Sequence, residues 1–135
     1  MSANVRVGGT RSTMAVLAFG LACLLAATAA WAKPSNKWRL EVSEGANSDG
    51  VIVVEIVPEG GTATDISIQI KDGTGENHVA RVIKDALEQQ LGKGYHVEVD
   101  DGEDVLVKAK SGTPHFDMVI KQQTVTGVRL HLQRE

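Results

Sequence analysis

Alternation of apolar and polar residues recurs in six segments after residue 32, and it restricts the chain to a fold rich in β-strands. A period of two puts every second side chain on one face, as in a strand with one buried side. The apolar members of the six segments are Trp38, Leu40 and Val42; Ile66, Ile68 and Ile70; Tyr95, Val97 and Val99; Val105, Val107 and Ala109; Phe116, Met118 and Ile120; and Val128, Leu130 and Leu132. Leu106 is an exception within the fourth segment. The pattern is typical of antiparallel strands.

Residues 51–57 form a seventh segment, which is apolar on both faces except at Glu55. Such a strand is expected in the middle of a sheet, with both of its faces covered. Glu55 would then need a cationic partner such as Arg39 or Lys71, or a place at the solvated edge of the sheet. We interpret it as a paired structural carboxylate, because no second member of a catalytic acid pair is evident.

One amphipathic helix is predicted between Thr74 and Gly92. Thr74 is the candidate N-cap, and Gly92 is placed to end the helix in a left-handed conformation. The apolar stripe consists of Val79, Val82, Ile83, Ala86, Leu87 and Leu91. The opposite, polar side consists of His78, Arg81, Lys84, Asp85, Glu88 and Gln89. This spacing of three and four residues predicts a helix with one buried face.

The elements together predict a single α+β domain over residues 33–135. A helix of about four turns is about 24 Å long, and it covers only three or four strands spaced about 4.8 Å apart. Seven strands would leave apolar surface uncovered on a flat sheet. We therefore predict a strongly bent, mainly antiparallel sheet of about seven strands, or two packed sheets, with the helix closing one side.

Residues 1–32 are predicted to be a cleaved secretory signal peptide. The segment starts with two arginines and no acid, continues with an uncharged run over residues 14–30, and ends in Ala30-Trp31-Ala32. The two alanines that flank Trp31 form the A-x-A pattern that signal peptidase recognises, and Pro34 stops a helix from continuing. The mature chain is then expected to be periplasmic or secreted, without a stable membrane anchor.

Two alternatives would keep the leader in the membrane. A permanent anchor needs about 20 apolar residues, which is more than this run supplies. Lipidation of Cys23 is the second alternative, but Gly20 stands three places before it, where a large aliphatic residue is usual. We favour the cleaved signal peptide over both.

Residues 33–135 are acidic and lack cysteine. They carry all 17 Asp and Glu but only 12 of the 14 Lys and Arg, which gives a net charge of −5. Nucleic acid and anionic lipid both require a positive surface, so neither is an expected partner. Because the one cysteine, Cys23, lies in the leader, the mature domain must be stabilised by its core without disulfides.

Residues 66–120 read as strand, Gly-containing turn, amphipathic helix, strand, Asp-Gly hairpin and strand, ending in the run Gly112-Thr113-Pro114-His115-Phe116-Asp117-Met118. This order resembles the β-α-β-β insert modules of flagellins, bacteriophage tail proteins and bacterial surface proteins. The resemblance covers about half of the mature chain and rests on the order of elements. It implies a structural or recognition role, and it carries over no catalytic residue.

No reactive motif is found in residues 33–135. The chain has no G-x-S-x-G nucleophile motif, no phosphate-binding loop and no dinucleotide fingerprint. Gly73 and Gly75 precede the helix, where backbone amides can hold an anion, but we interpret them as a plain turn. No catalytic residue, cofactor-binding residue or metal ligand is therefore predicted.

Three histidines, His96, His115 and His131, lie at outward positions of three predicted strands. If those strands were neighbours, the histidines could converge with Asp117 or Glu98 into a zinc or copper site, or into the acid–base pair of a hydrolase. No two of them have the spacing of a metal-binding pair. We interpret all three as solvated residues on a polar face.

Two further clusters have ordinary structural readings. Four acids fall within residues 100–104, around Gly102. Calcium prefers such oxygen ligands, but the segment lacks EF-hand spacing, and an exposed hairpin turn at Asp101-Gly102 explains it. Trp38 and Phe116 lie on the inward sides of their strands, which favours core packing over a ligand-facing aromatic pair.

The sequence therefore favours an exported, non-catalytic binding or assembly module. The expected partner is another envelope or extracellular protein, or a glycan. The alternative is a small periplasmic metal-binding protein or hydrolase that uses the surface histidines. The sequence gives no indication of the oligomeric state.

Overall fold

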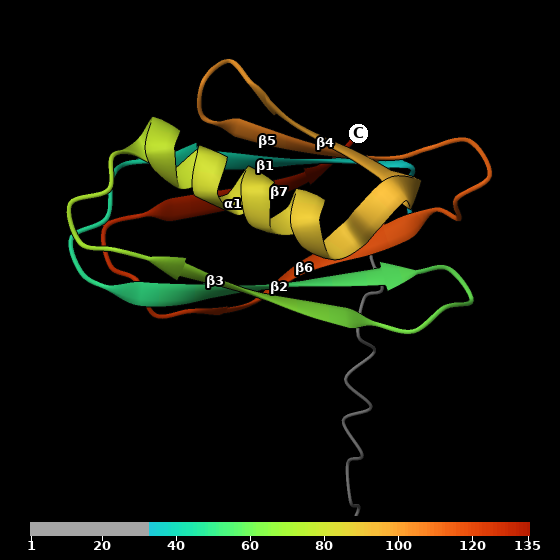
Figure 1. Ribbon diagram of the computed structural model, residues 1–135, viewed down its shortest axis with the longest axis horizontal. Coiled ribbons are helices and arrows are strands. Elements are labelled where there is room, and N and C mark those ends of the chain that lie inside the picture. Colours follow the sequence, from blue (N-terminus) through green and yellow to red (C-terminus); the bar gives the residue numbers. More distant parts are fainter. Residues whose placement is uncertain (1–32) are drawn as a thin grey trace, which may run out of the picture. The chain divides into compact units, whose positions relative to one another are not determined.

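The computed structural model describes residues 33–135, and the predicted signal peptide, including Cys23, lies outside the described residues. This part of the chain forms seven strands and one long helix, which are labelled in Figure 1. The strands are β1 (Lys37–Ser43), β2 (Gly50–Pro58), β3 (Thr64–Ile70), β4 (Tyr95–Asp100), β5 (Asp104–Ala109), β6 (Phe116–Gln123) and β7 (Arg129–Arg134). The helix α1 spans Glu76–Leu91 and continues into a 3-10 turn, Gly92–Gly94. Within residues 33–135, no helix is both long and apolar enough to cross a membrane.

The seven strands form two antiparallel sheets. The four-stranded sheet has the order β4-β5-β1-β7, and the three-stranded sheet has the order β3-β2-β6. The sheets face each other, and α1 lies along the side between them (Figure 1). This confirms the predicted α+β class and shows that the strands are divided between two packed sheets.

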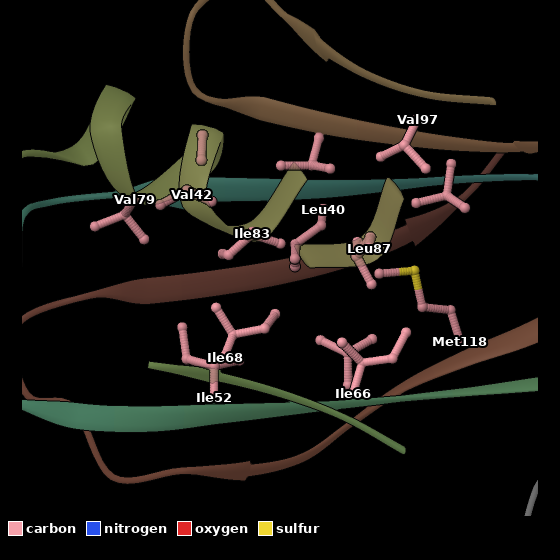
Figure 2. Close-up of a cluster of buried hydrophobic side chains, with 14 of the residues drawn as sticks. Leu40, Val42, Ile52, Ile66, Ile68, Val79, Ile83, Leu87, Val97 and Met118 are labelled. Atoms are coloured by element: carbon pink, nitrogen blue, oxygen red, sulfur yellow. The ribbon is translucent and has the colours of Figure 1, made fainter. Parts of the chain in front are cut away.

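The core lies between the two sheets and under α1. The four-stranded sheet supplies Leu40 and Val42 to it, and the three-stranded sheet supplies Ile52 and Ile68, all at most 2% exposed. Figure 2 shows these side chains pointing toward one another, together with those of the helix. The period-two alternation thus marks the inner faces correctly.

The helix α1 closes the side of the molecule where β3 and β4 are edge strands. It packs against both of these strands and also against β1 and β5. Val79, Ile83 and Leu87 are fully buried, and Figure 2 shows them pointing into the core. The predicted apolar stripe is therefore the packed face of the helix.

The ends of the helix differ in part from the prediction. Gly75, not Thr74, is the N-cap residue, and no side chain caps the helix. The Thr74 hydroxyl instead donates a hydrogen bond of 2.7 Å to the Lys71 carbonyl within the preceding turn. Gly92 does end the helix, with φ 68° and ψ −154°, a backbone conformation that only glycine adopts without strain.

The strand β2 is central in its sheet, as predicted, but only one of its faces is covered. Ile52, Val54 and Ile56 are buried on the inner face. Val51 and Val53 on the outer face are only partly buried, because no element of residues 33–135 forms a layer there. The expectation that both faces are covered is therefore wrong. The strands β3 and β6 flank β2 at its edges, and α1 packs on the inner side, so the outer face of β2 has no covering layer within residues 33–135.

Trp38 and Phe116 connect the two sheets from within. Both side chains are buried, and the Trp38 indole Nε1 donates a hydrogen bond of 2.8 Å to the Phe116 carbonyl. The Tyr95 ring meets the Phe116 ring edge to face, with centroids 5.2 Å apart. Core packing, as predicted, is the use of this aromatic pair.

Three connections meet at one end of the molecule. The β1–β2 connection pairs with the β3–α1 connection through Ala46 N and Thr74 O at 2.8 Å. It pairs with the β6–β7 connection through Asn47 N and Thr126 O, also at 2.8 Å. Gly50 has no room for a side chain, since a Cβ there would lie 2.3 Å from the Val125 backbone nitrogen.

A charge on the packed face of α1 should unfold the domain. We expect Leu87→Asp to abolish cooperative folding, because an unpaired buried charge costs several kcal/mol against a total stability of about 5–15 kcal/mol. Glu88→Ala, at the next position, removes only an exposed pair with Lys84 and should change stability by less than about 0.5 kcal/mol. Thermal unfolding followed by circular dichroism checks both, and an unchanged melting temperature for Leu87→Asp would contradict the packing.

Candidate functional site

The three histidines considered for chemistry lie far apart in the fold. His96 is on β4 and His131 is on β7, the two opposite edges of the four-stranded sheet. His115 precedes β6, which belongs to the other sheet. In the described part of the chain, no three His, Cys, Asp or Glu side chains are grouped so that they could hold a metal ion. The convergence on which a metal site or a histidine-based hydrolase would depend does not occur.

His96 does meet one of its two predicted carboxylates. Its Nε2 lies 3.1 Å from Glu98 Oε2, and Lys108 Nζ lies 3.1 Å from the other oxygen of the same carboxylate. These contacts, with that to His96 the largest, lower the pKa of Glu98 below its usual value. All three side chains are substantially exposed, so the group is a surface ion cluster of modest energy.

Arg39 organises the acidic end of the four-stranded sheet. Its guanidinium lies 2.6 Å from Asp104, 3.3 Å from Asp100 and 2.5 Å from Glu135. The Glu135 and Asp104 hydrogen bonds raise the pKa of Arg39 above its usual value. Leu106, which breaks the alternation of β5, lies on this outer face opposite Arg39 and is only 3% exposed.

The acidic run at residues 100–104 forms the β4–β5 hairpin turn, as predicted. Asp101 and Gly102 both have positive φ, 49° and 84°, which is the conformation that Asp-Gly turns adopt. Asp100 and Asp104 are directed to Arg39. Next to them an open groove of about 540 Å³ is lined by Glu41, Val42, Ser43, Asp101, Glu103, Asp104, Arg129, Leu130 and His131. The groove is lined by both acidic and basic side chains, and one of its acids, Asp104, is already paired with Arg39.

The outer face of the three-stranded sheet is different, because it presents aliphatic side chains. We call the set Val51, Val53, Val57 and Val119 the valine face. Val119 is 39% exposed and is the one exposed large apolar side chain in residues 33–135. The three valines of β2 are half-buried. The surrounding positions are polar, and they are Glu55, Asp65, Ser67, Gln69, Lys121 and Gln122.

Glu55 lies within this face and is paired, but not with a predicted partner. Lys121 Nζ lies 3.2 Å from Glu55 and 2.8 Å from Asp65. These two carboxylates, Asp65 first, raise the pKa of Lys121. Arg39 pairs with carboxylates of the other sheet, whereas Lys121 lies on β6, the strand that pairs directly with β2. The interpretation of Glu55 as a paired structural carboxylate holds, whereas the partners Arg39 and Lys71 are wrong.

A pocket of about 380 Å³ borders the valine face at Val57. Its lining consists of Pro34, Val57, Pro58, Glu59, Gly60, Gly61 and Asp117. Asp117 is only 9% exposed, and its Oδ1 accepts a hydrogen bond of 2.9 Å from the Met118 backbone N–H. Within residues 33–135 this carboxylate forms no salt bridge to any Lys, Arg or His. An ionised carboxylate in such a place is costly unless a positive group compensates it.

Sequence reasoning missed the valine face and the pocket lined by Asp117, which we call the Asp117 pocket. It placed Asp117 on an exposed polar face with the histidines, because Asp117 occupies an outward position of its strand. The N-terminal segment covers that position, since Ser35 pairs with Phe116 and Pro34 lines the pocket. The valine face had a visible signal in the two-sided apolar pattern of residues 51–57, which was interpreted as burial on both sides.

No protein-family model matches this sequence, and no curated protein matches it. The fold and the surfaces described above therefore carry the functional argument.

Without the Glu135 carboxylate, the domain should lose less stability when the pH is lowered. Contacts with Lys37 and then Arg39 lower the pKa of Glu135 in the folded protein. Its contribution is thus present above the unfolded pKa of about 4.3 and is lost as the pH falls through the lower folded value. We expect Glu135→Gln to melt at a lower temperature than the wild type at pH 6. Its melting temperature should also fall less than that of the wild type between pH 5 and pH 3.

The control for this measurement is Asp101→Asn, a change in the nearby turn of an acid that makes no ion pair within residues 33–135. Its acid profile should follow that of the wild type. A Glu135→Gln profile parallel to the wild type over the whole range would show that the Arg39 cluster does not stabilise the fold.

Proposed function

We propose that this chain is an exported, non-catalytic module that binds another protein through the valine face. The observation that carries the proposal is the half-exposed row of Val51, Val53 and Val57 along the central strand, beside Val119. An antiparallel sheet with one solvated face normally carries polar residues there. An aliphatic row on such a face is typical of an interaction surface.

The chemistry around the valine face favours a protein partner over a glycan. Its apolar centre is surrounded by the ion pairs of Lys121 and by polar residues on β3, which is the arrangement of a protein interface with an apolar core and a polar rim. Sugar rings are commonly bound by stacking on exposed aromatic rings, but Trp38 and Phe116 are buried in the core. The partner is therefore expected to be an envelope or extracellular protein.

Export and the absence of catalysis are parts of the same proposal. Export rests on the predicted signal peptide at residues 1–32, and it implies a periplasmic or extracellular location. The separation of His96, His115 and His131 supports a non-catalytic role, because it removes the geometric basis of the hydrolase and metal-carrier alternatives. The charge of −5 over residues 33–135 supports partners other than nucleic acid or anionic lipid.

A lysine in the valine face should weaken partner binding without unfolding the domain. The processed protein, immobilised, is used to capture partners from the envelope fraction, and the affinity of each purified partner is then measured for wild type and variants. We expect Val119→Lys to weaken binding about tenfold or more, which corresponds to about 1.4 kcal/mol, because it places a charge in the apolar centre of the interface. The change is at an exposed position, so the melting temperature should stay near that of the wild type.

The matched control is Gln133→Lys, the same new side chain on β7 in the other sheet. It should bind within a factor of about two of the wild type. Equal affinity of Val119→Lys and wild type for every captured partner would contradict the assignment of the valine face. Turnover of a substrate by the purified protein would contradict the non-catalytic role.

A further inference from the structure

We infer that the Asp117 pocket receives the α-ammonium group that cleavage of the leader creates at Lys33. This inference rests on the export and cleavage after Ala32 in the proposed function. The pocket shares Val57 with the valine face, but it does not include Val119, the position that tests that face. It gives the pocket a defined ligand, a primary ammonium group supplied by the chain itself. The mature N-terminus would then be docked against β6.

The first step is the state of the pocket. Asp117 is nine-tenths buried, and its carboxylate makes one hydrogen bond, to the N–H of the next residue. Glu59 is the other charged residue in the lining, and it is also acidic. No Lys, Arg or His of residues 33–135 lines the pocket. The site therefore has negative charge, low polarity in its walls and no counter-charge, which is the environment that binds a cation most strongly.

The second step is the position of the N-terminal segment. Ser35 and Phe116 exchange two backbone hydrogen bonds of 2.9 Å, which fixes residue 35 against β6 one position before Asp117. Pro34 is part of the pocket wall. The Lys33 carbonyl accepts a hydrogen bond of 3.3 Å from Arg134. Since consecutive Cα atoms are about 3.8 Å apart, the Lys33 nitrogen is held within reach of the pocket that Pro34 lines.

The third step is the change that cleavage makes. Before cleavage the Lys33 nitrogen is a neutral amide with one N–H, and afterwards it is an ammonium group with three donors and a positive charge. Hydrolysis of the Ala32–Lys33 peptide bond adds water, leaving a carboxylate on Ala32 and the ammonium on Lys33. A charge-assisted hydrogen bond to Asp117 is stronger than a neutral one, so the processed chain gains a contact that the precursor cannot make.

Glu59 lines the pocket, and further titratable groups lie near Asp117 or the N-terminal segment. Glu59, in the turn after β2, adds negative charge, and exposed His115 lies directly before β6, two positions before Asp117. Arg134 on β7 reaches the Lys33 carbonyl, and the Lys33 side chain carries its own ammonium. A free α-amino group ordinarily titrates at about 7.7–8.0, between the ordinary ranges of histidine and lysine side chains. The pH range from 7.5 to 9.5 therefore reports mainly on the α-amino group.

The test uses protein expressed as the full precursor, exported by the host and purified after processing. Intact-mass measurement identifies the first residue. Thermal unfolding is then recorded from pH 7 to pH 9.5 for wild type, Asp117→Asn and the control Asp72→Asn, an exposed acid at the other end of the sheet. A docked ammonium has a raised folded pKa, so its contribution is present below the unfolded pKa of about 8 and is lost as the pH rises through the folded value.

We expect the intact mass to be that of a chain beginning at Lys33. The melting temperature of the wild type and of Asp72→Asn should decrease by about 4 °C or more across this pH range. Asp117→Asn should lack this decrease. A second measurement does not depend on stability: at pH 7.5, acetylation of the α-amino group should be about tenfold slower in the wild type than in Asp117→Asn, because the docked amine is protonated and shielded.

A first residue other than Lys33, or equal acetylation rates and parallel pH profiles for wild type and Asp117→Asn, would overturn the inference. These outcomes leave the protein-binding proposal intact, since that proposal is judged by Val119→Lys. Conversely, Val119→Lys should keep the pH profile and the acetylation rate of the wild type.

Discussion

The rest of the structure depends on the burial of one face of α1 between the free edges of two sheets. Neither sheet closes on itself, and on this side β3 and β4 would leave the inner faces open to water. Val79, Ile83 and Leu87 fill that opening and are fully buried, and each such side chain contributes about 1.5–3 kcal/mol. Since residues 33–135 contain no cysteine, this packing stabilises the domain without the disulfides that many small secreted domains have.

The outer faces of the two sheets differ in how much apolar surface they expose to solvent. On the four-stranded sheet, Arg39 pairs with carboxylates from three segments of the chain, and Leu106, its neighbour on the same face, is only 3% exposed. On the three-stranded sheet, the charges of Lys121 and Glu55 lie beside valines that stay partly exposed. One outer face therefore has its charges paired within the domain, and the other leaves apolar side chains exposed to solvent.

Local patterns predicted most of the fold, and the errors arose where distant segments meet. Alternation identified the inner faces of the strands, and helical spacing identified the packed side of α1, because both depend only on neighbours in sequence. The partner of Glu55 could not be predicted, since it depends on the pairing of β2 with β6, a strand distant in sequence. The burial of Asp117 depends on a segment more than 80 residues away in sequence, so its outward position in an alternating strand was misleading. The histidines failed to converge because strand order is not encoded in local pattern.

The position of β1 in the middle of the four-stranded sheet has a consequence for how the chain acquires its structure. Its partners are β5 and β7, so the first strand of residues 33–135 pairs with residues that are synthesised more than 60 positions later. Such distant pairing raises the contact order and slows folding. The polypeptide is therefore expected to stay unfolded until nearly all of it has been made, which is the condition in which a chain can be threaded through a translocation pore.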